Sequence, residues 1–153
     1  MFNIGDMVCY PMHGVGAIEA IEEHVVLGET TQYYMLRFLG GRITAMVPVH
    51  TADTVGLRLV ISAKECECVK EYMATNSASE SDNWNQRYRE NMEKLRSGDV
   101  YGVADVVKGL IKRDRERGLS AGERKMLATA RSVLLAELSA ASGEQPEAFA
   151  DLL

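Results

Sequence analysis

Hydrophobic residues follow two different periods along this chain, and the period changes near residue 60. Before that point, short apolar runs are separated by glycine, proline and charged residues, which is typical of β-strands. These runs predict strands at residues 7–10, 17–22, 33–39 and 43–47. After that point, apolar residues recur every three or four positions, which indicates amphipathic helices. We therefore expect an α+β protein in which a small β module precedes an all-α helical bundle.

Turn residues define the β module, which we expect to occupy residues 1–55. Gly40-Gly41 predicts a tight hairpin between the last two strands, because both glycines reach positive φ without steric cost. Pro48 lacks a backbone N–H and should end the ladder, and residues 49–55 then predict one helical turn closed by Gly56. Four or five short strands in so short a segment favour a strongly bent barrel of the SH3 or Tudor kind.

Capping residues define the helical module, which we expect to occupy residues 62–153. Ser62 with Glu65, and Ser120 with Glu123, each form a capping box that satisfies free backbone donors at a helix start. Asp99 can cap a helix between them, and glycines mark helix ends. The expected helices span about residues 62–75, 84–97, 99–117 and 120–142, with a short one from Pro146.

The single tryptophan lies at the start of one of these helices, directly after the polar run 76–82. Spacings of four, four and three place four apolar side chains on one stripe, flanked by Arg87 and Arg89. The stripe consists of Trp84, Tyr88, Met92 and Leu95. An exposed indole beside guanidinium groups suits nucleic acid, since arginine binds phosphates and a flat ring can wedge between bases. Taken alone, however, the segment favours an ordinary packing face that ends at Trp84.

Acidic residues outnumber basic ones overall, and the formal net charge is −5. The window 84–131 reverses this balance, with twelve basic residues against seven acidic ones. The two signs alternate in runs such as residues 113–117, for which a solvated helix face is the ordinary interpretation. Strong autonomous DNA binding is therefore not expected.

Composition favours a reduced, cytoplasmic protein without metal or cofactor. No apolar run approaches the ~20 residues that a membrane-spanning helix needs, and no signal peptide is recognisable. Cys9, Cys66 and Cys68 show no disulfide-framework spacing, and the last two should point to different sides of a helix. Cys9 has the neighbours of a small buried hydrophobe. Without a glycine-rich phosphate loop or a nucleophile elbow, we do not expect an enzyme.

Four blocks of sequence, in the right order, carry a resemblance to a known family. They are residues 5–14, 46–48, 83–99 and 113–123. Through them the chain resembles the CarD/CdnL family of bacterial transcription regulators over about residues 2 to 140. The resemblance implies a Tudor-like N-terminal domain, similar to the polymerase-interacting domain of transcription-repair coupling factor, that binds a lobe of the RNA polymerase β subunit. It also implies C-terminal helices that approach promoter DNA at the upstream edge of the melted bubble.

This resemblance changes the interpretation of Trp84. In the family, a tryptophan at the matching position inserts at the minor groove and hinders the bubble from closing. We therefore expect Trp84 to contact DNA, with Arg87 and Arg89 holding phosphates, while the rest of the stripe remains core. The implied function is stabilisation of the open promoter complex, with ribosomal RNA promoters among the usual targets. Polymerase would tether this acidic protein, which we expect to be a monomer, at its DNA.

The expected polymerase contact is an exposed strand edge, whose unpaired backbone groups a partner strand can complete. Its residues are Ile43, Thr44, Ala45, Met46 and Val47, with His24 and Val25 nearby. Strand alternation requires about half of these side chains to be barrel core. Some relatives carry arginines at the positions of His24 and Met46, so backbone pairing rather than charge pairing is the expected contact.

Two other functions remain compatible with the residues. A Tudor-like module could bind a different protein, such as a repair or anti-termination partner, while the helices serve only assembly. Alternatively, the central helices could bind DNA autonomously, like a helix-turn-helix, which the weak local charge excess disfavours. Recovery of the polymerase β subunit from a bacterial lysate would favour stabilisation of the open promoter complex over both of these alternatives.

Overall fold

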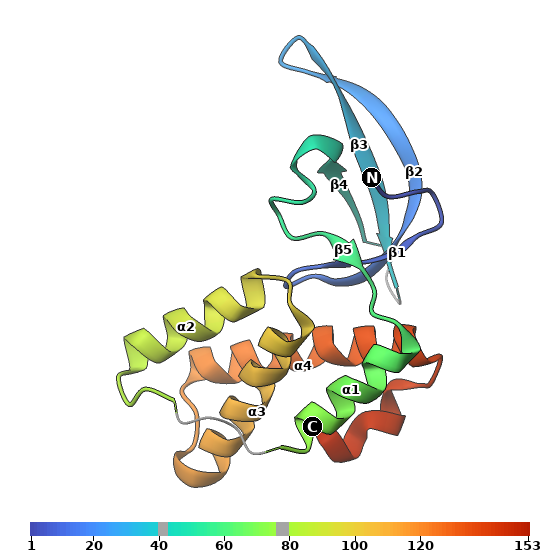
Figure 1. The fold of residues 1–153 in the computed structure, drawn as a ribbon. Coiled ribbons are helices and arrows are strands. Elements are labelled where there is room, and N and C mark those ends of the chain that lie inside the picture. Colours follow the sequence, from blue (N-terminus) through green and yellow to red (C-terminus); the bar gives the residue numbers. More distant parts are fainter. Residues whose placement is uncertain (40–42, 76–79) are drawn as a thin grey trace.

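The computed structural model of the protein describes residues 1–39, 43–75 and 80–153. An antiparallel sheet lies on one side of the molecule and the helices lie on the other (Figure 1). The sheet contains β1 (Met7–Tyr10), β2 (Gly14–Val26), β3 (Glu29–Phe38), β4 (Thr44–Pro48) and β5 (Arg58–Leu59), with the short 3-10 helix η1 (Val49–Thr51) after β4. The helical side contains α1 (Ala63–Met73), α2 (Trp84–Arg96), α3 (Val100–Arg117), α4 (Ala121–Ser142) and the 3-10 helix η2 (Pro146–Leu152). The predicted α+β class is confirmed.

The sheet is open rather than closed into a barrel. Its strand order is β4-β3-β2-β1-β5, and within the described residues the two outer strands do not pair with each other. β5 is only two residues long and therefore offers too short a ladder to close the sheet. The predicted strands are present, and the hairpin predicted at Gly40-Gly41 falls on residues outside the described ranges.

The hairpin of β2 and β3 is longer than the sequence predicted. Its paired residues continue to Val26 opposite Glu29, and its end projects from the rest of the sheet (Figure 1). The side chains of Val25, Val26 and Leu27 are exposed there, Leu27 completely. Because neither face of this extension is buried, the hydrophobic pattern gave no signal for it, and the backbone ladder alone defines it. A register shift between Ile18 and Ala20 marks a bulge, which bends the strand.

The β module has its own core of fully buried side chains. They are Val8, Ile18, Tyr34, Leu36, Val47, Ala52 and Leu57. Leu57 and β5 come after residue 55, so the packed β module of the structure includes residues beyond the predicted boundary. β5 pairs with β1 through Leu59 opposite Val8 and Arg58 opposite Cys9.

The helices begin and end where the capping residues predicted. Ser62 and Ser120 accept hydrogen bonds from the backbone N–H groups of Glu65 and Glu123, and Asp99 accepts one from Tyr101. Gly143 follows α4 in the left-handed conformation that glycine adopts most readily. The helical core is a separate cluster whose centre is completely buried, including Val106, Leu110, Leu134, Leu138 and Phe149. No helix in the three described ranges is long and apolar enough to cross a membrane.

A close approach of three chain segments, at Pro11, Gly56 and Gly98, joins the two modules. Gly56 and Gly98 both have positive φ, and a Cβ added at Gly56 would lie 2.9 Å from Cγ of Pro11. A Cβ at Gly98 would lie 3.0 Å from the carbonyl oxygen of Gly56. Both positions therefore require glycine for conformation as well as space. The next residue after Pro11, Met12, packs its side chain against the helical core.

An ion pair reinforces this junction. The guanidinium of Arg58, in β5, donates to both carboxylate oxygens of Glu137, in α4, with Nη2 2.7 Å from Oε1. Glu137 is 2 % exposed and also accepts from the backbone N–H of Ile61 at 3.1 Å, while Arg58 Nε donates to the carbonyl oxygen of Gly98. Burial, with a smaller effect from Glu137, raises the pKa of the neighbouring Cys9 thiol to about 12. Cys9 is therefore an inert, protonated part of the core, as its sequence neighbours indicated.

Candidate nucleic-acid and partner interfaces

Trp84 is the first residue of α2, and its side chain is 42 % exposed. One face of the indole stacks on Tyr88, with ring centroids 4.9 Å apart and an angle of 19° between the planes. The indole Nε1 donates a hydrogen bond to Oγ of Ser120, the residue that caps α4, at 3.1 Å. The ring is therefore held at its polar edge and on one face, while a large part of its surface is open to solvent.

The buried face of α2 is rotated relative to the predicted stripe. Arg87, Asn91 and Leu95, at spacings of four, are its buried residues. Tyr88 and Met92 are only partly buried against the helical core, and Trp84 lies at the margin. Leu95 is thus core as expected, whereas the aromatic positions border the packed face.

Arg87 does not lie where a phosphate contact requires it. Its side chain is 2 % exposed, with Nε 2.9 Å from Oε2 and Nη2 3.2 Å from Oε1 of Glu123. Nη1 donates to the carbonyl oxygens of Ser81 and Asp82, at 3.0 and 3.4 Å. The hydrogen bonds to Glu123 raise the pKa of Arg87, which stays charged. The structure thus overturns the phosphate role predicted for Arg87, because a buried guanidinium that already bonds to Glu123, Ser81 and Asp82 is not available to DNA.

Other arginines surround Trp84 instead. A shallow hollow of about 430 Å³ beside the indole is lined by Arg113 and Arg117 from the end of α3 and by Arg124 from α4. Arg117 lies 3.5 Å from Asp82, an exposed pair that contributes little stability. Arg89 is exposed on α2. Sequence reasoning missed the three hollow-lining arginines because they come from other helices. The signal for Arg113 and Arg117 was the mixed-charge run 113–117, which was interpreted as a solvated face, and Arg124 lies outside that run.

The predicted strand edge is present at β4. Among the residues that the structure describes, β4 pairs with β3 alone, and Phe38 N donates to Ile43 O at 3.1 Å. Hydrogen-bonded and non-bonded pairs alternate along an antiparallel ladder. Ala45 therefore directs its backbone groups toward β3, whereas Thr44 and Met46 direct theirs outward. Within β4, Val47 is 1 % exposed and its neighbour Met46 is 46 % exposed, which matches the expected alternation. Ile43 precedes β4 and is 70 % exposed, although it has the same parity as Val47.

His24 and Val25 lie outside the stretch of the sheet that β4 borders. His24 pairs with Thr31, whereas β4 ends with Pro48 opposite Tyr33. The two residues therefore lie beyond the Pro48 end of β4, on the projecting hairpin, and Ile43 lies at the other end. His24 contacts Glu22 at 3.0 Å and the ring of Tyr33, with centroids 5.7 Å apart.

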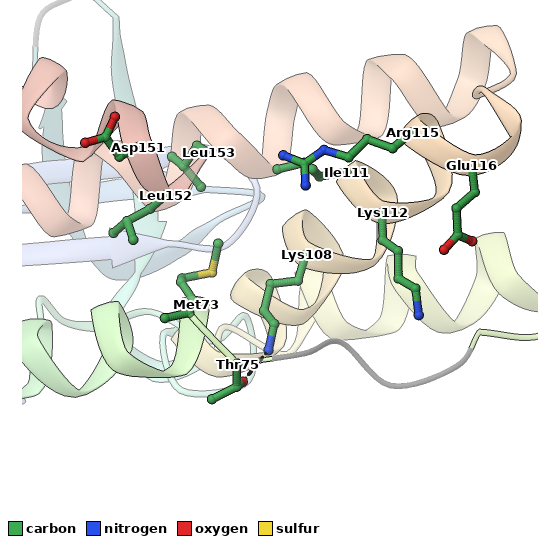
Figure 2. Close-up of a pocket in the computed structure, with 11 residues that line it drawn as sticks. Met73, Thr75, Lys108, Ile111, Lys112, Arg115, Glu116, Asp151, Leu152 and Leu153 are labelled. Carbon is green, nitrogen blue, oxygen red and sulfur yellow. Dashed lines mark hydrogen bonds between the residues drawn. The ribbon is translucent and has the colours of Figure 1, made fainter.

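A larger hollow, of about 760 Å³, lies between α1, α3 and η2 (Figure 2). The ammonium of Lys108 points into the gap beside Thr75 and donates to Thr75 Oγ1 at 2.8 Å and to the Tyr72 carbonyl at 3.0 Å. These contacts satisfy the carboxyl end of α1, so the lysine connects two helices. Among the described residues, no group of three or more His, Cys, Asp or Glu side chains is arranged to hold a metal ion.

Both modules match families of known proteins. Residues 2–61 match the family described as the CarD-like/TRCF RID domain, and residues 68–153 match the CarD C-terminal domain. The class is thus a transcription regulator with an N-terminal module of the type that interacts with RNA polymerase. The chain belongs to the CarD family, as the four sequence blocks indicated. It is 38 % identical over 146 residues to a Bacillus subtilis (strain 168) protein named "Putative transcription factor YdeB", covering 94 % of each chain.

Proposed function

We propose that this protein binds a lobe of the RNA polymerase β subunit and stabilises the open promoter complex. In this function, Trp84 wedges at the minor groove on the upstream edge of the melted bubble. The observation that carries the proposal is the partly exposed indole at the start of α2, in a family of transcription regulators. A wholly buried tryptophan would have supported the packing interpretation instead.

The wedge acts by favouring one state of the promoter over another. A factor shifts an equilibrium only through contacts that one state has and the other lacks. An apolar ring gains a partner in DNA only when a base step is unstacked, so its contribution is made to the distorted duplex and not to the closed one. The half-exposed indole of Trp84 has the free surface for such a contact.

Phosphate contacts in this proposal come from arginines that reach the protein surface. Exposed Arg89 stays in the set, and half-buried Arg113 and exposed Arg124 join it because both line the hollow beside the indole. Arg87 is removed from the set. Such contacts position the duplex without reading its sequence, which suits a regulator that acts at many promoters.

The polymerase contact is proposed at the outward side of β4. The outward-facing N–H and C=O groups of Thr44 and Met46 can pair with an edge strand of the partner. The exposed side chains of Ile43 and Met46 would add apolar area, and His24 and Val25 on the hairpin would form a separate second contact. This contact supplies the tether that a protein of net charge −5 needs near DNA.

Fluorescence anisotropy with labelled promoter duplexes tests the tethered function. Free protein should bind only in the non-specific range of ~10⁻⁴–10⁻⁶ M. With polymerase present, it should join the promoter complex at much lower concentration, and purified β-subunit lobe should be retained on immobilised protein. Nanomolar, sequence-selective binding by the free protein would instead favour an autonomous DNA-binding regulator.

A further inference from the structure

The indole of Trp84 is connected to a buried ion pair through one hydroxyl group. Ser120 Oγ lies 3.1 Å from Trp84 Nε1, 3.2 Å from the backbone N of Glu123 and 3.3 Å from Oε1 of Glu123. A serine hydroxyl has one proton and two lone pairs. Here it donates its proton to the carboxylate and accepts from the indole and from the backbone. All three positions are occupied, so the direction of the indole bond follows from the position of Glu123.

Glu123 is in turn fixed by Arg87. The two side chains are 2–3 % exposed and form two parallel hydrogen bonds, a geometry that specifies orientation as well as charge. The same guanidinium donates to the carbonyl oxygens of Ser81 and Asp82, the two residues before the N-cap of α2. The pair therefore fastens the start of α2, where Trp84 lies, to the start of α4, where Ser120 lies.

We propose that Ser120 and Glu123, supported by Arg87, are positioning residues that hold the Trp84 indole in one orientation before it meets DNA. Tyr88 supports one ring face at 4.9 Å, and the Ser120 bond fixes rotation in the ring plane. A side chain that is already ordered loses less conformational entropy on binding. This inference rests on the proposed wedge function of Trp84 and adds how the wedge is prepared.

The single tryptophan makes this orientation measurable in the free protein. Time-resolved fluorescence anisotropy of Trp84 separates local ring motion from tumbling of the whole protein. Ser120→Ala removes the acceptor without changing any charge, so the fast local component should grow. Ordering the loosened ring on DNA should then cost enough to shorten the open-complex lifetime about two- to tenfold. Binding to polymerase should be unchanged.

A matched variant separates this effect from loss of a helix cap. Ser62 caps α1 in the same way, because its hydroxyl accepts a hydrogen bond from the backbone N–H of Glu65 at 3.1 Å. This hydroxyl makes no bond to Trp84, whose indole donates to Ser120. Ser62→Ala should therefore lose cap stability, as Ser120→Ala does, but leave the anisotropy decay and the lifetime unchanged. Ser120→Thr keeps the hydroxyl and should restore both readouts.

Three results would overturn the positioning role. The first is an unchanged anisotropy decay in Ser120→Ala, and the second is an equal effect from Ser62→Ala. The third is a Ser120→Ala variant whose indole is more mobile but whose open-complex lifetime is unchanged, although Trp84→Ala shortens that lifetime. In the last case the wedge function would stand and only the positioning would fail. If Trp84→Ala itself left the lifetime unchanged, the proposed function would fail, whatever the fluorescence showed of the ring.

Discussion

Two arginine–glutamate pairs in this protein use the same chemistry at opposite ends of one helix. Glu123 lies at the start of α4 and Glu137 near its end, and each accepts two hydrogen bonds from one guanidinium. The partner of Glu123 is Arg87, inside the helical module, and both side chains are 2–3 % exposed. The partner of Glu137 is Arg58, which comes from the sheet and is 28 % exposed.

The difference between the pairs shows what each one specifies. A buried ion pair contributes little net stability, because desolvation offsets most of the attraction, but it fixes geometry. We interpret the Arg87–Glu123 pair as orienting one side chain, Trp84, and the Arg58–Glu137 pair as orienting one whole module against the other. In the proposed function, the Arg58–Glu137 pair orients the polymerase-binding module, and the Arg87–Glu123 pair orients the DNA-wedging side chain.

The largest effect is expected from Glu123→Ala. It leaves the guanidinium of Arg87 buried without a counter-charge, which costs about 3–5 kcal/mol in free energy of unfolding. Urea denaturation measures this loss. The double variant Arg87→Met with Glu123→Leu is the control, and it should recover most of the stability because no charge remains buried. A double variant as unstable as the single one would show that packing, rather than the unpaired charge, causes the loss.

A smaller effect is expected from Glu137→Ala. Arg58 is partly exposed and can turn toward water, so the cost should be about 2 kcal/mol, below that of a wholly buried pair. The change should also loosen the two modules relative to each other. Distances between spin labels on β3 and on α3 should broaden in this variant and stay narrow in Glu123→Ala. Equal broadening in both would contradict the division of roles between the pairs.

Acid should weaken the first pair by protonation. Burial alone would raise the pKa of Glu123, but its hydrogen bonds and charge interaction with Arg87 outweigh this, and the pKa lies below its ordinary value of 4.5. Because the carboxyl pKa is lower in the folded state than in the unfolded state, ionised Glu123 stabilises the protein at pH values above the unfolded-state pKa. This stabilisation is lost as the pH falls through the folded-state pKa. Denaturation midpoints should therefore decline below about pH 4.5 less steeply in the uncharged double variant than in the wild type. Parallel declines would contradict the prediction.

The smallest effect on stability is expected from Thr44→Pro, which touches neither pair. Its N–H faces away from β3, so the ladder keeps its bonds and the unfolding free energy should change by less than about 1 kcal/mol. Binding to the polymerase β lobe should nevertheless weaken, because an outward donor is lost. Ala45→Pro, which removes an inward donor, is the control and should destabilise the sheet. Unchanged polymerase binding by Thr44→Pro would exclude backbone pairing at that position.

Much of the fold could be predicted from local sequence signals. The caps at Ser62, Asp99 and Ser120 and the glycine after α4 fixed the helix bounds, because these signals act within a few residues. The projecting hairpin could not be predicted, since its end buries neither face. Barrel closure was predicted from strand number alone, whereas the short β5 leaves the sheet open.

The candidate site was less predictable, and Arg87 shows why. Its spacing from Trp84 suggested a shared surface, but the residue that decides its role, Glu123, lies 36 positions away in the sequence. A charged residue on a helix is normally exposed, so only the packing of α2 against α4 could show that this one is buried. The arginines from α3 and α4 were missed because they, too, lie far from Trp84 in the sequence and only the packing of the helices brings them beside it.

The central claim is that Trp84 acts on the open complex rather than on folding, and its most direct test is Trp84→Ala. The measurement is the lifetime of competitor-challenged open complexes at saturating protein, with polymerase binding and unfolding free energy determined in parallel. We predict a lifetime close to that without the protein, unchanged polymerase binding and a stability loss of about 1–2 kcal/mol, because the ring is 42 % exposed. A normal lifetime combined with the ~3–5 kcal/mol loss of a wholly buried aromatic would show that Trp84 is core and contradict the account.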